Sequence, residues 1–296
     1  MSSDLFLLLI AFVVLGILPG LADWSLPGRV VRRPAIMGIL NLTPDSFSDG
    51  GLIPDLPTAV RRAEQLVEAG ADLLDLGGES SRPGADPVSI DEEIRRVVPV
   101  VEALASRIGV PLSIDTTKAE VAQAALRAGA AVINDIQGLL GDDQMPRVVA
   151  ESGAGVVLMH MQGSPRTMQA NPTYADVVTE VYDALAFRID RAESFGIDRS
   201  RIAIDPGIGF GKTADHNWQL LRHLDRFAGL GCAILIGTSR KRFLGALTGR
   251  DVSERTTASV VSSLLAIEAG ADIVRVHDVG PMADAVKVWS AMRPSR

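Results

Sequence analysis

Short apolar runs alternate with longer amphipathic segments along almost the whole chain after residue 34. Short apolar runs are typical of buried strands, and apolar residues three or four positions apart are typical of helices with one buried face. Strands are predicted at residues 35–40, 72–76, 111–115, 131–135, 155–160, 201–205, 232–237 and 272–277. Helices are predicted at residues 57–70, 90–107, 117–128, 143–152, 174–195, 215–228, 253–269 and 281–292.

This alternation gives eight strand–helix units. Strands that are apolar throughout indicate a parallel sheet covered by helices, and eight units is the number that closes a (β/α)8 TIM barrel. The alternative α/β architecture is an open doubly wound sheet, which is disfavoured because no Gly-x-Gly-x-x-Gly sequence follows the first strand. No linker rich in Pro or Ser divides the chain, so residues 24–296 are expected to form one domain.

Residues 1–23 form an apolar extension ahead of this domain. The run from 5 to 21 is uncharged and near the lower limit for a membrane span, about 17 residues. It lacks the basic start and the cleavage site of a secretory signal. Because Arg29, Arg32 and Arg33 follow it, an inserted segment would leave the domain on the cytoplasmic side. The alternatives to a membrane anchor are a packed extra segment and a start codon assigned too far upstream.

Composition and charge exclude several classes of function. Apolar residues make up 47% of the 296 residues, enough for a large core, and the formal charge is −7. An acidic chain of this kind argues against a general nucleic-acid binder but leaves room for a local cationic pocket. The single cysteine, Cys232, excludes an internal disulfide framework and a Cys-rich metal site, and its apolar surroundings predict a buried strand residue.

Polar residues follow nearly every predicted strand. Barrels of this class carry their active sites at the C-terminal ends of the strands. A helix cap or an internal ion pair explains any one such residue, but structural needs alone would not place the whole set at one end. In chain order the set comprises Asn41, Asp45, Ser46, Phe47, Ser48 and Asp49, residues 77–84, Asp115, Asn134, Asp135, Met159, His160, Asp205, residues 206–212 and 237–242, Arg275 and His277.

Some of these residues suit a flat heterocycle rich in N–H donors. Asp115, Asn134 and Asp205 offer carboxylates and an amide from three strand ends. Acceptors arranged in this way match such a ring because each unmatched donor would be costly to bury. Lys241, on the seventh loop, is placed to donate to a ring carbonyl or nitrogen. His160 has two open interpretations, a structural role or a substrate contact.

Other residues suit an anion. Arg275, His277 and Arg82 are cationic or become so on protonation. Arginine binds phosphate oxygens through two parallel hydrogen bonds, so these residues predict a phosphate site within a net acidic protein.

Taken together, these segments resemble the dihydropteroate synthase family across roughly residues 24–292. No single segment is specific, but their order and spacing are. The segments are MGILNLTPDSFSDGG (37–51), DLGGESSRPG (75–84), SIDT (113–116), NDI (134–136), LMHMQGSPRTMQ (158–169), DPGIGFGK (205–212), SRK (239–241) and RVHDV (275–279).

The resemblance implies a (β/α)8 barrel that joins p-aminobenzoate to 6-hydroxymethyl-7,8-dihydropterin pyrophosphate. The products would be pyrophosphate and 7,8-dihydropteroate, in folate biosynthesis. It also implies Mg²⁺ as cofactor, a homodimer and membership of a family that sulfonamides target. No motif at the strand ends indicates a nucleic-acid partner. By resemblance, Asp115, Asn134, Asp205 and Lys241 hold the pterin ring, with Ile136 and Met159 against its faces. Arg275 and His277 bind pyrophosphate, and Asn41 helps to hold Mg²⁺. Phe47, Ser81, Arg82 and Pro83 shape the p-aminobenzoate pocket with Lys241, and Asp49 faces the developing positive charge.

Two features depart from the family pattern. The second loop reads ESSRPG where the family commonly has ESTRPG, so Ser81 keeps the hydroxyl and lacks a methyl group. The apolar extension is the other departure, and it leaves the location of the protein open. Two rival functions are a methyltetrahydrofolate-dependent methyltransferase, which would lack the 239–241 and 275–277 segments in this form, and a non-catalytic pterin-binding paralogue. The paralogue would be expected to lose Asn41, Asp115, Lys241 or Arg275, and all four are present.

Overall fold

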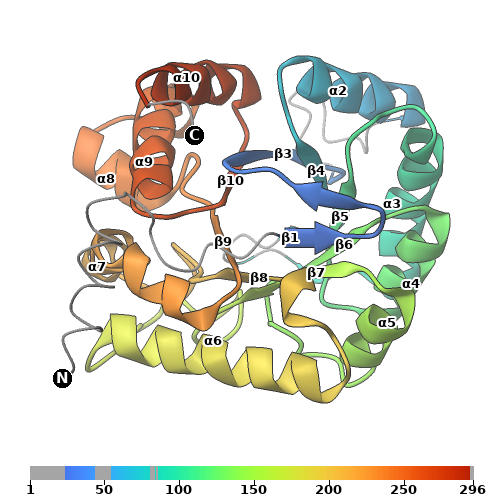
Figure 1. The fold of residues 1–296 in the computed structure, drawn as a ribbon, viewed down its shortest axis with the longest axis horizontal. Coiled ribbons are helices and arrows are strands. Elements are labelled where there is room, and N and C mark those ends of the chain that lie inside the picture. Colours follow the sequence, from blue (N-terminus) through green and yellow to red (C-terminus); the bar gives the residue numbers. More distant parts are fainter. Residues whose placement is uncertain (1–23, 44–54, 81–83, 85, 294–296) are drawn as a thin grey trace, which may run out of the picture.

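The computed structural model describes residues 24–43, 55–80, 84 and 86–293. Eight parallel strands close into a barrel in the order β10-β3-β4-β5-β6-β7-β8-β9, so the predicted fold is confirmed (Figure 1). Each predicted strand lies within one residue of the observed one at either end. The strands are β3 (Ala35–Asn41), β4 (Leu73–Gly77), β5 (Leu112–Asp115), β6 (Val132–Asp135), β7 (Gly155–Met159), β8 (Ile202–Asp205), β9 (Ala233–Ile236) and β10 (Ile273–Val276).

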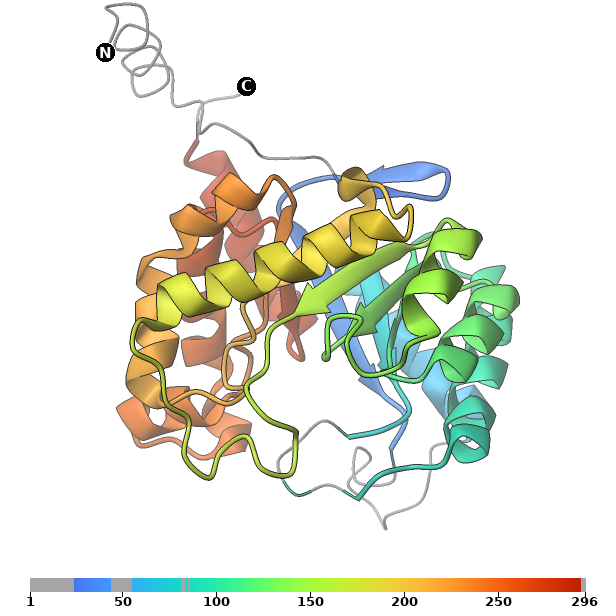
Figure 2. The same cartoon turned by 90° about the horizontal axis from the view of Figure 1, so that it is seen from below.

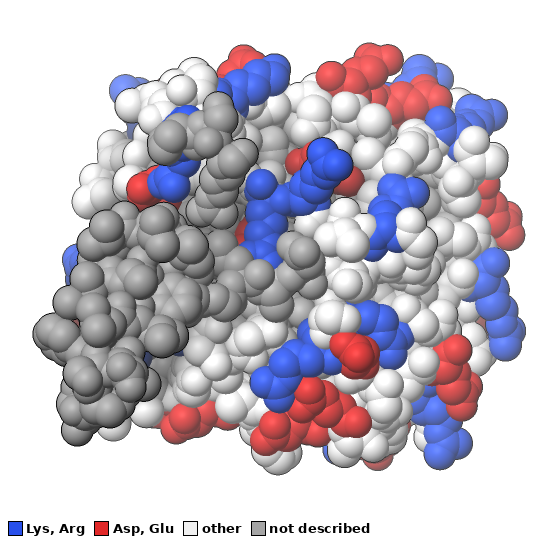
Figure 3. All heavy atoms as spheres, in the orientation of Figure 1, with Lys and Arg blue, Asp and Glu red and all other residues white. Residues whose placement is uncertain are grey.

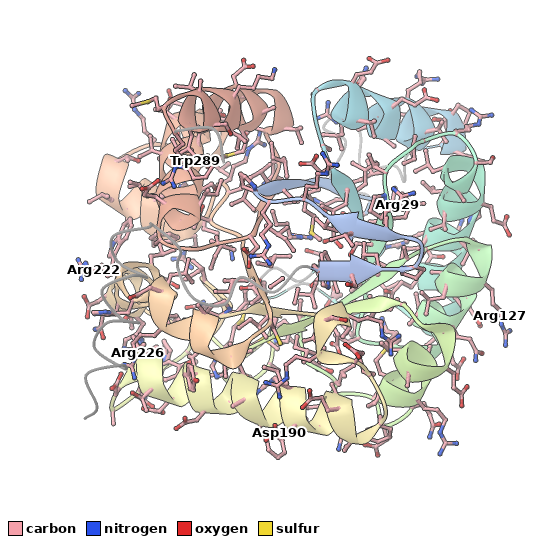
Figure 4. The ribbon with its side chains drawn as sticks, viewed as in Figure 1. Arg29, Arg127, Asp190, Arg222, Arg226 and Trp289 are labelled. Atoms are coloured by element: carbon pink, nitrogen blue, oxygen red, sulfur yellow. The ribbon has the colours of Figure 1, made fainter. Side chains whose placement is uncertain are left out.

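Helices form the outer layer of the barrel (Figures 1 and 2). Their apolar faces pack on the outside of the strands in one large buried cluster, while charged side chains such as Arg127 and Asp190 point outward (Figure 4). The predicted helix at 215–228 is observed as a helix followed by a 3-10 segment, η3 (Leu224–Leu230). The helices are α2 (Leu56–Glu68), α3 (Ile90–Ala105), α4 (Ala119–Ala128), α5 (Met145–Ser152), α6 (Val177–Ser194), α7 (Ala214–Arg222), α8 (Arg242–Thr248), α9 (Thr256–Glu268) and α10 (Val279–Ala291).

The strand register brings the polar strand ends to one edge of the barrel. Asn41 is level with Gly77, Gly77 with Asp115, and Asp115 with Asn134. On the next pair of strands, Met159 is level with Asp205. Because all the strands run in the same direction, these residues share the C-terminal rim, as the sequence predicted.

A hairpin that the sequence did not predict closes the opposite end of the barrel. Strands β1 (Trp24–Leu26) and β2 (Arg29–Val31) pair antiparallel. Trp24 is 1% exposed and donates from Nε1 to the carbonyl of Arg201 at 2.9 Å. Its neighbours in the buried cluster are residues near the starts of the barrel strands, including Met37, Leu73 and Ile273. The barrel is therefore sealed at its N-terminal end.

The structure bears differently on the predictions for Cys232 and for the membrane anchor. Cys232, one residue before β9, is buried as predicted, and burial raises the pKa of its thiol to about 12. None of the helices in the described part of the chain has both the length and the apolar character needed to cross a membrane. The candidate anchor at residues 5–21 lies outside the described residues. On the face shown in Figure 3, acidic and basic side chains are interspersed.

Candidate active site

Arg275 links two carboxylates at the C-terminal rim of the barrel. It projects from β10 and donates from Nε to Asp75 Oδ2 at 2.6 Å and from Nη2 to Asp115 Oδ2 at 2.9 Å. Asp75 is fully buried on β4 and also accepts from Asn134 Nδ2 at 3.0 Å and from Ser113 Oγ at 2.6 Å. One carboxylate thus fixes both a guanidinium and an amide. Because the Asn134 amide group is held by Asp75, its carbonyl oxygen remains the acceptor on offer to a ligand.

Asp75 was missed by the sequence analysis, which placed it within a buried strand. A signal was present, because residues 72–76 read DLLDL and a carboxylate in the middle of an apolar strand needs a partner. The partner comes from β10, 200 residues further along the chain. Chain pattern alone does not reveal a contact between residues so far apart.

The electrostatics of this cluster follow from its burial. Burial raises the pKa of Asp115 to about 7, Arg275 lowers it, and the neighbouring Asp75 carboxylate raises it further. Burial acts in the opposite sense on Arg275, but Asp75 and Asp115 outweigh it and hold the pKa of the guanidinium above its ordinary value. Arg275 therefore stays charged, and the proton count of the cluster near neutral pH depends on Asp115.

Asp205 and Lys241 form the second half of the site. Asp205 ends β8 and accepts the backbone N–H of Gly207 at 2.7 Å. Burial raises its pKa, and Lys241 is the charge that most opposes this rise. Lys241 immediately precedes α8, donates to the carbonyl of Ile208, and lies 4.8 Å from the centroid of the Phe210 ring. Burial lowers the pKa of Lys241 to about 8, against the effect of Asp205.

Glycine at 209 makes room for this lysine. Its φ is +81°, and a Cβ there would lie 3.1 Å from Lys241 Cδ. A side chain at this position would both strain the backbone and press on the lysine. The segment 205–212 therefore positions Lys241 in two ways, through the space left at Gly209 and through the carbonyl of Ile208.

His277 and Asn41 complete the described rim. The Ser239 hydroxyl accepts the His277 backbone N–H at 3.2 Å and lies 3.0 Å from His277 Nδ1, where it is placed to donate. This arrangement directs Nε2 of the ring away from Ser239. Asn41 ends β3, and its Oδ1 lies 3.7 Å from the position that a Cβ would take at Gly77. That distance is an ordinary van der Waals contact, so the two residues are neighbours at this rim.

His160, at the end of β7, does not stand alone. Its Nδ1 lies 3.0 Å from Nζ of Lys212, a buried lysine that the sequence analysis had not singled out. Burial, then Lys212, lower the pKa of His160 to about 2, so the imidazole is neutral at physiological pH. Of the two interpretations of His160, this pairing favours the structural one.

The structure brings most of the predicted residues together. Asn41, Asp115, Asn134, Asp205, Lys241, Arg275 and His277 all lie on the rim, and Ile136 and Met159 are buried there, 8% and 2% exposed. Five predicted residues, Phe47, Asp49, Ser81, Arg82 and Pro83, lie outside the described residues. Among the residues that are described, no three His, Cys, Asp or Glu side chains are grouped so as to hold a metal ion.

Comparison with known proteins agrees with this geometry. Residues 37–277 match the family model described as pterin binding enzyme. The dihydropteroate synthase of Synechocystis is 45% identical, and the match covers 92% of each chain. The structure of the Yersinia pestis dihydropteroate synthase with a sulfonamide drug complex is 44% identical, with a TM-score of 0.88 over 92% of this chain and 100% of that one.

A second similar structure contains a different ligand. The Xanthomonas albilineans dihydropteroate synthase with 4-aminobenzoic acid is 49% identical, with a TM-score of 0.85, over 90% of this chain and 96% of that one. The barrel fold and nearly half of the aligned residues are thus shared along nearly the full length. The chain belongs to the pterin binding enzymes and, among them, to the dihydropteroate synthases.

Proposed function

We propose that the described rim carries out the family's reaction with Asp115, Asn134, Asp205 and Lys241 holding the pterin ring. As a dihydropteroate synthase the chain is a transferase that condenses p-aminobenzoate with 6-hydroxymethyl-7,8-dihydropterin pyrophosphate in folate synthesis. The observation that carries the assignment of roles is the grouping of two carboxylates, an amide oxygen and a lysine at one rim, within the matched segment. These groups complement the donors and the carbonyl of a pterin.

The apolar residues at the same rim supply the faces of the pocket. Ile136 follows β6 and Met159 ends β7, and both are nearly fully buried. A flat ring between them would exchange the water on its two faces for apolar packing, which is favourable. We assign these two side chains to the faces of the pterin ring.

The cationic residues are assigned to the leaving group. His277 and the remaining N–H groups of Arg275 would bind the pyrophosphate oxygens. Arg275 is positioned by Asp75 and Asp115, so it meets the anion in a fixed orientation. Asn41, half-buried at the end of β3, offers a hard amide oxygen, which fits Mg²⁺, an ion that often takes only one or two protein ligands besides substrate phosphates and water. When bound, the ion would neutralise charge on the departing pyrophosphate.

The chemistry needs no protein nucleophile. The bond between the exocyclic methylene carbon and the pyrophosphate oxygen breaks, and its electron pair leaves with pyrophosphate. The electron-rich dihydropterin carries the resulting positive charge, which Asp115 and Asp205 stabilise when they are ionised. The amine nitrogen of p-aminobenzoate then bonds to that carbon and loses a proton. The predicted roles of Phe47, Asp49, Ser81, Arg82 and Pro83 in the p-aminobenzoate pocket remain predictions.

A homodimer is supported by one face of the barrel. Helices α8, α9 and α10 lie side by side (Figure 1), and each exposes large apolar residues. These are Leu247 on α8, Val261 and Leu265 on α9, and Val288 on α10, all more than half exposed. Apolar residues grouped on neighbouring helices mark an interaction surface, and a second copy of the chain is the partner that we propose.

The proposed location of the catalytic domain is the cytoplasm. Arg29, Arg32 and Arg33 follow the apolar run 5–21 and, by the preference of cytoplasmic flanks for positive charge, support this side of a membrane. Whether residues 5–21 tether the domain to the inner face of a membrane remains a prediction.

The test is the formation of dihydropteroate by the full chain and by a form without residues 1–23, each with and without Mg²⁺. Mg²⁺-dependent product from both forms is expected. Pterin binding without product from either folded protein would instead support the non-catalytic paralogue, and methyl transfer from methyltetrahydrofolate would support the methyltransferase.

A further inference from the structure

Lys212 is a buried lysine whose three donors are all used. It is 3% exposed and lies in the loop between β8 and α7. Its Nζ lies 3.0 Å from His160 Nδ1, 3.0 Å from the carbonyl oxygen of Phe210 and 3.4 Å from that of His160. Burial lowers the pKa of Lys212 to about 7, against the effect of Asp205, so the group is an ammonium below that pH. In that form it has three N–H donors, and three acceptors surround it. Lys212 thus ties the end of β7 to the loop 206–212.

This loop is held from other sides as well. Asn217 on α7 accepts the N–H of Gly209 at 2.7 Å, and Gln169 donates to the carbonyl of Gly209 at 2.6 Å. The Tyr174 hydroxyl donates to the carbonyl of Gly211 at 2.9 Å. A Cβ at Gly207 would lie 1.9 Å from the carbonyl oxygen of His160, so the loop also packs tightly on the end of β7. The backbone of 206–212 is therefore fixed, with Lys212 as its internal anchor.

The anchored loop supplies what Lys241 contacts. The carbonyl of Ile208 accepts from Lys241, and the Phe210 ring lies beside its ammonium group. The carbonyl next to that ring is one of the three acceptors around Lys212. Moving the loop would move both contacts of Lys241.

Lys212 also acts on Asp205 by charge. The charges that lower the pKa of Asp205 are Lys241, Lys212 and Arg275, besides the N–H of Gly207, and burial opposes them. Facing Lys212 itself are Asp205, Lys241, Arg188 from α6 and the neutral His160, with the Tyr174 ring 6.0 Å away. Asp205 is the one anion among these neighbours of Lys212.

We propose that Lys212 is a positioning residue of the pterin site, which fixes the loop that holds Lys241 and acts through its charge on Asp205. The inference rests on the proposed roles of Asp205 and Lys241 in holding pterin. It assigns to a residue outside the ligand-contacting set both a geometric and an electrostatic effect on pterin binding, and these two effects can be separated by substitution.

The direction of the electrostatic effect follows from charge. Without the Lys212 charge, the pKa of Asp205 rises, and the carboxylate is protonated at a higher pH than in the parent protein. A protonated Asp205 presents a donor where the pterin needs an acceptor. As the pH is lowered, pterin affinity should therefore begin to fall at a higher pH in a variant without the Lys212 charge than in the parent protein.

The experiment compares Lys212→Gln, which removes the charge, with Lys212→Arg, which keeps it. The dissociation constant of 6-hydroxymethyl-7,8-dihydropterin, which lacks the pyrophosphate, is measured between pH 5 and 7.5, along with kcat. Lys287→Met on α10, where the lysine is 77% exposed, is the control for loss of a distant lysine. We call the fall in pterin affinity at low pH the acid limb. The Gln variant should move the acid limb to higher pH and lower kcat. The Arg variant should leave the limb in place but lower kcat through the displaced loop.

The outcomes are distinct. A folded Gln variant with the parent's acid limb would overturn the charge role, and an Arg variant with the parent's kcat would overturn the geometric role. Should the Gln variant not fold, the Arg variant still decides, because an acid limb that moves although the charge is retained contradicts the proposal. If the parent protein does not bind the pterin at all, the proposed function fails rather than the role of Lys212.

Discussion

Replacing Asp75 by asparagine tests whether one buried carboxylate orients both Arg275 and Asn134. Asp75 accepts three hydrogen bonds, from Arg275 Nε, Asn134 Nδ2 and Ser113 Oγ. Asparagine has nearly the same shape but no charge, and one of its two terminal atoms is a donor group. The NH2 group of the new asparagine would face a donor on Arg275, Asn134 or Ser113, so that one hydrogen bond would be lost. The substitution therefore removes a charge and at least one acceptor with little change in volume.

The expected cost has two parts. Removing one partner of a buried ion pair costs about 3–5 kcal/mol. Because Arg275 is 21% exposed and keeps Asp115 as a second partner, the lower end, about 3 kcal/mol, is expected. That corresponds to a fall of about 6–12 °C in Tm for a domain of this size. Losing the charge-assisted bond that orients Arg275, worth about 1.5–3 kcal/mol, should lower kcat/KM about 10- to 150-fold.

The assay measures kcat/KM for both substrates and Tm for Asp75→Asn and for a matched control, Ser113→Ala. The control removes a donor to the same carboxylate without changing Arg275 or Asn134, so it should cost about 1 kcal/mol of stability and leave kcat/KM within about threefold. Parental kcat/KM in a folded Asp75→Asn protein would refute the reasoning. Equal losses in both variants would show that the carboxylate supports the barrel interior rather than orienting the two ligand-binding groups.

Four further predictions concern the rim and the outer surface. Lys241→Ala should abolish turnover while the circular dichroism spectrum stays native, and near-normal turnover would contradict the role given to that lysine. Because burial lowers the pKa of Lys241 to about 8, its donor proton is lost as pH rises through that value, so kcat/KM should fall above about pH 8; a rate that stays flat to pH 9.5 would exclude Lys241 as the titrating group. Ser81→Thr should keep activity and change the sulfonamide inhibition constant modestly, and an unchanged constant would argue against a contact at that methyl group. Leu265→Glu, at a residue 63% exposed on α9, should give a monomer in light scattering, whereas an unaltered mass would place any dimer contact elsewhere.

The barrel was predictable because its signal is local and repeated. Each unit has a short apolar strand and a helix with three-to-four spacing, and the parallel register then follows from the fold class. The missing elements are those with little periodic signal. Strands β1 and β2 have three residues each, and α8 has seven, too few turns to show an apolar stripe.

The site was predictable at the level of which residues face it. Parallel strands of matched register bring Asn41, Asp115 and Asn134 level, so their positions at strand ends were enough. Their partners were not predictable, because Arg275 meets Asp75 and Asp115 across 200 and 160 residues of chain. Lys212 was hidden for the same reason, since its partner His160 lies on another strand end 52 residues away.

In the described part of the chain, the hairpin β1–β2 covers the N-terminal end of the barrel, so ligands are expected to approach from the C-terminal rim. With Trp24 seated among the strand starts, two substrates and two products must pass through the same rim. The molecule that binds deepest then has to arrive first and leave last. With the pterin ring proposed among Asp115, Asn134 and Asp205, p-aminobenzoate would bind after the pterin. Excess p-aminobenzoate, or slow release of pyrophosphate, would then inhibit turnover. The order of binding would then follow from the proposed place of the pterin ring at this rim.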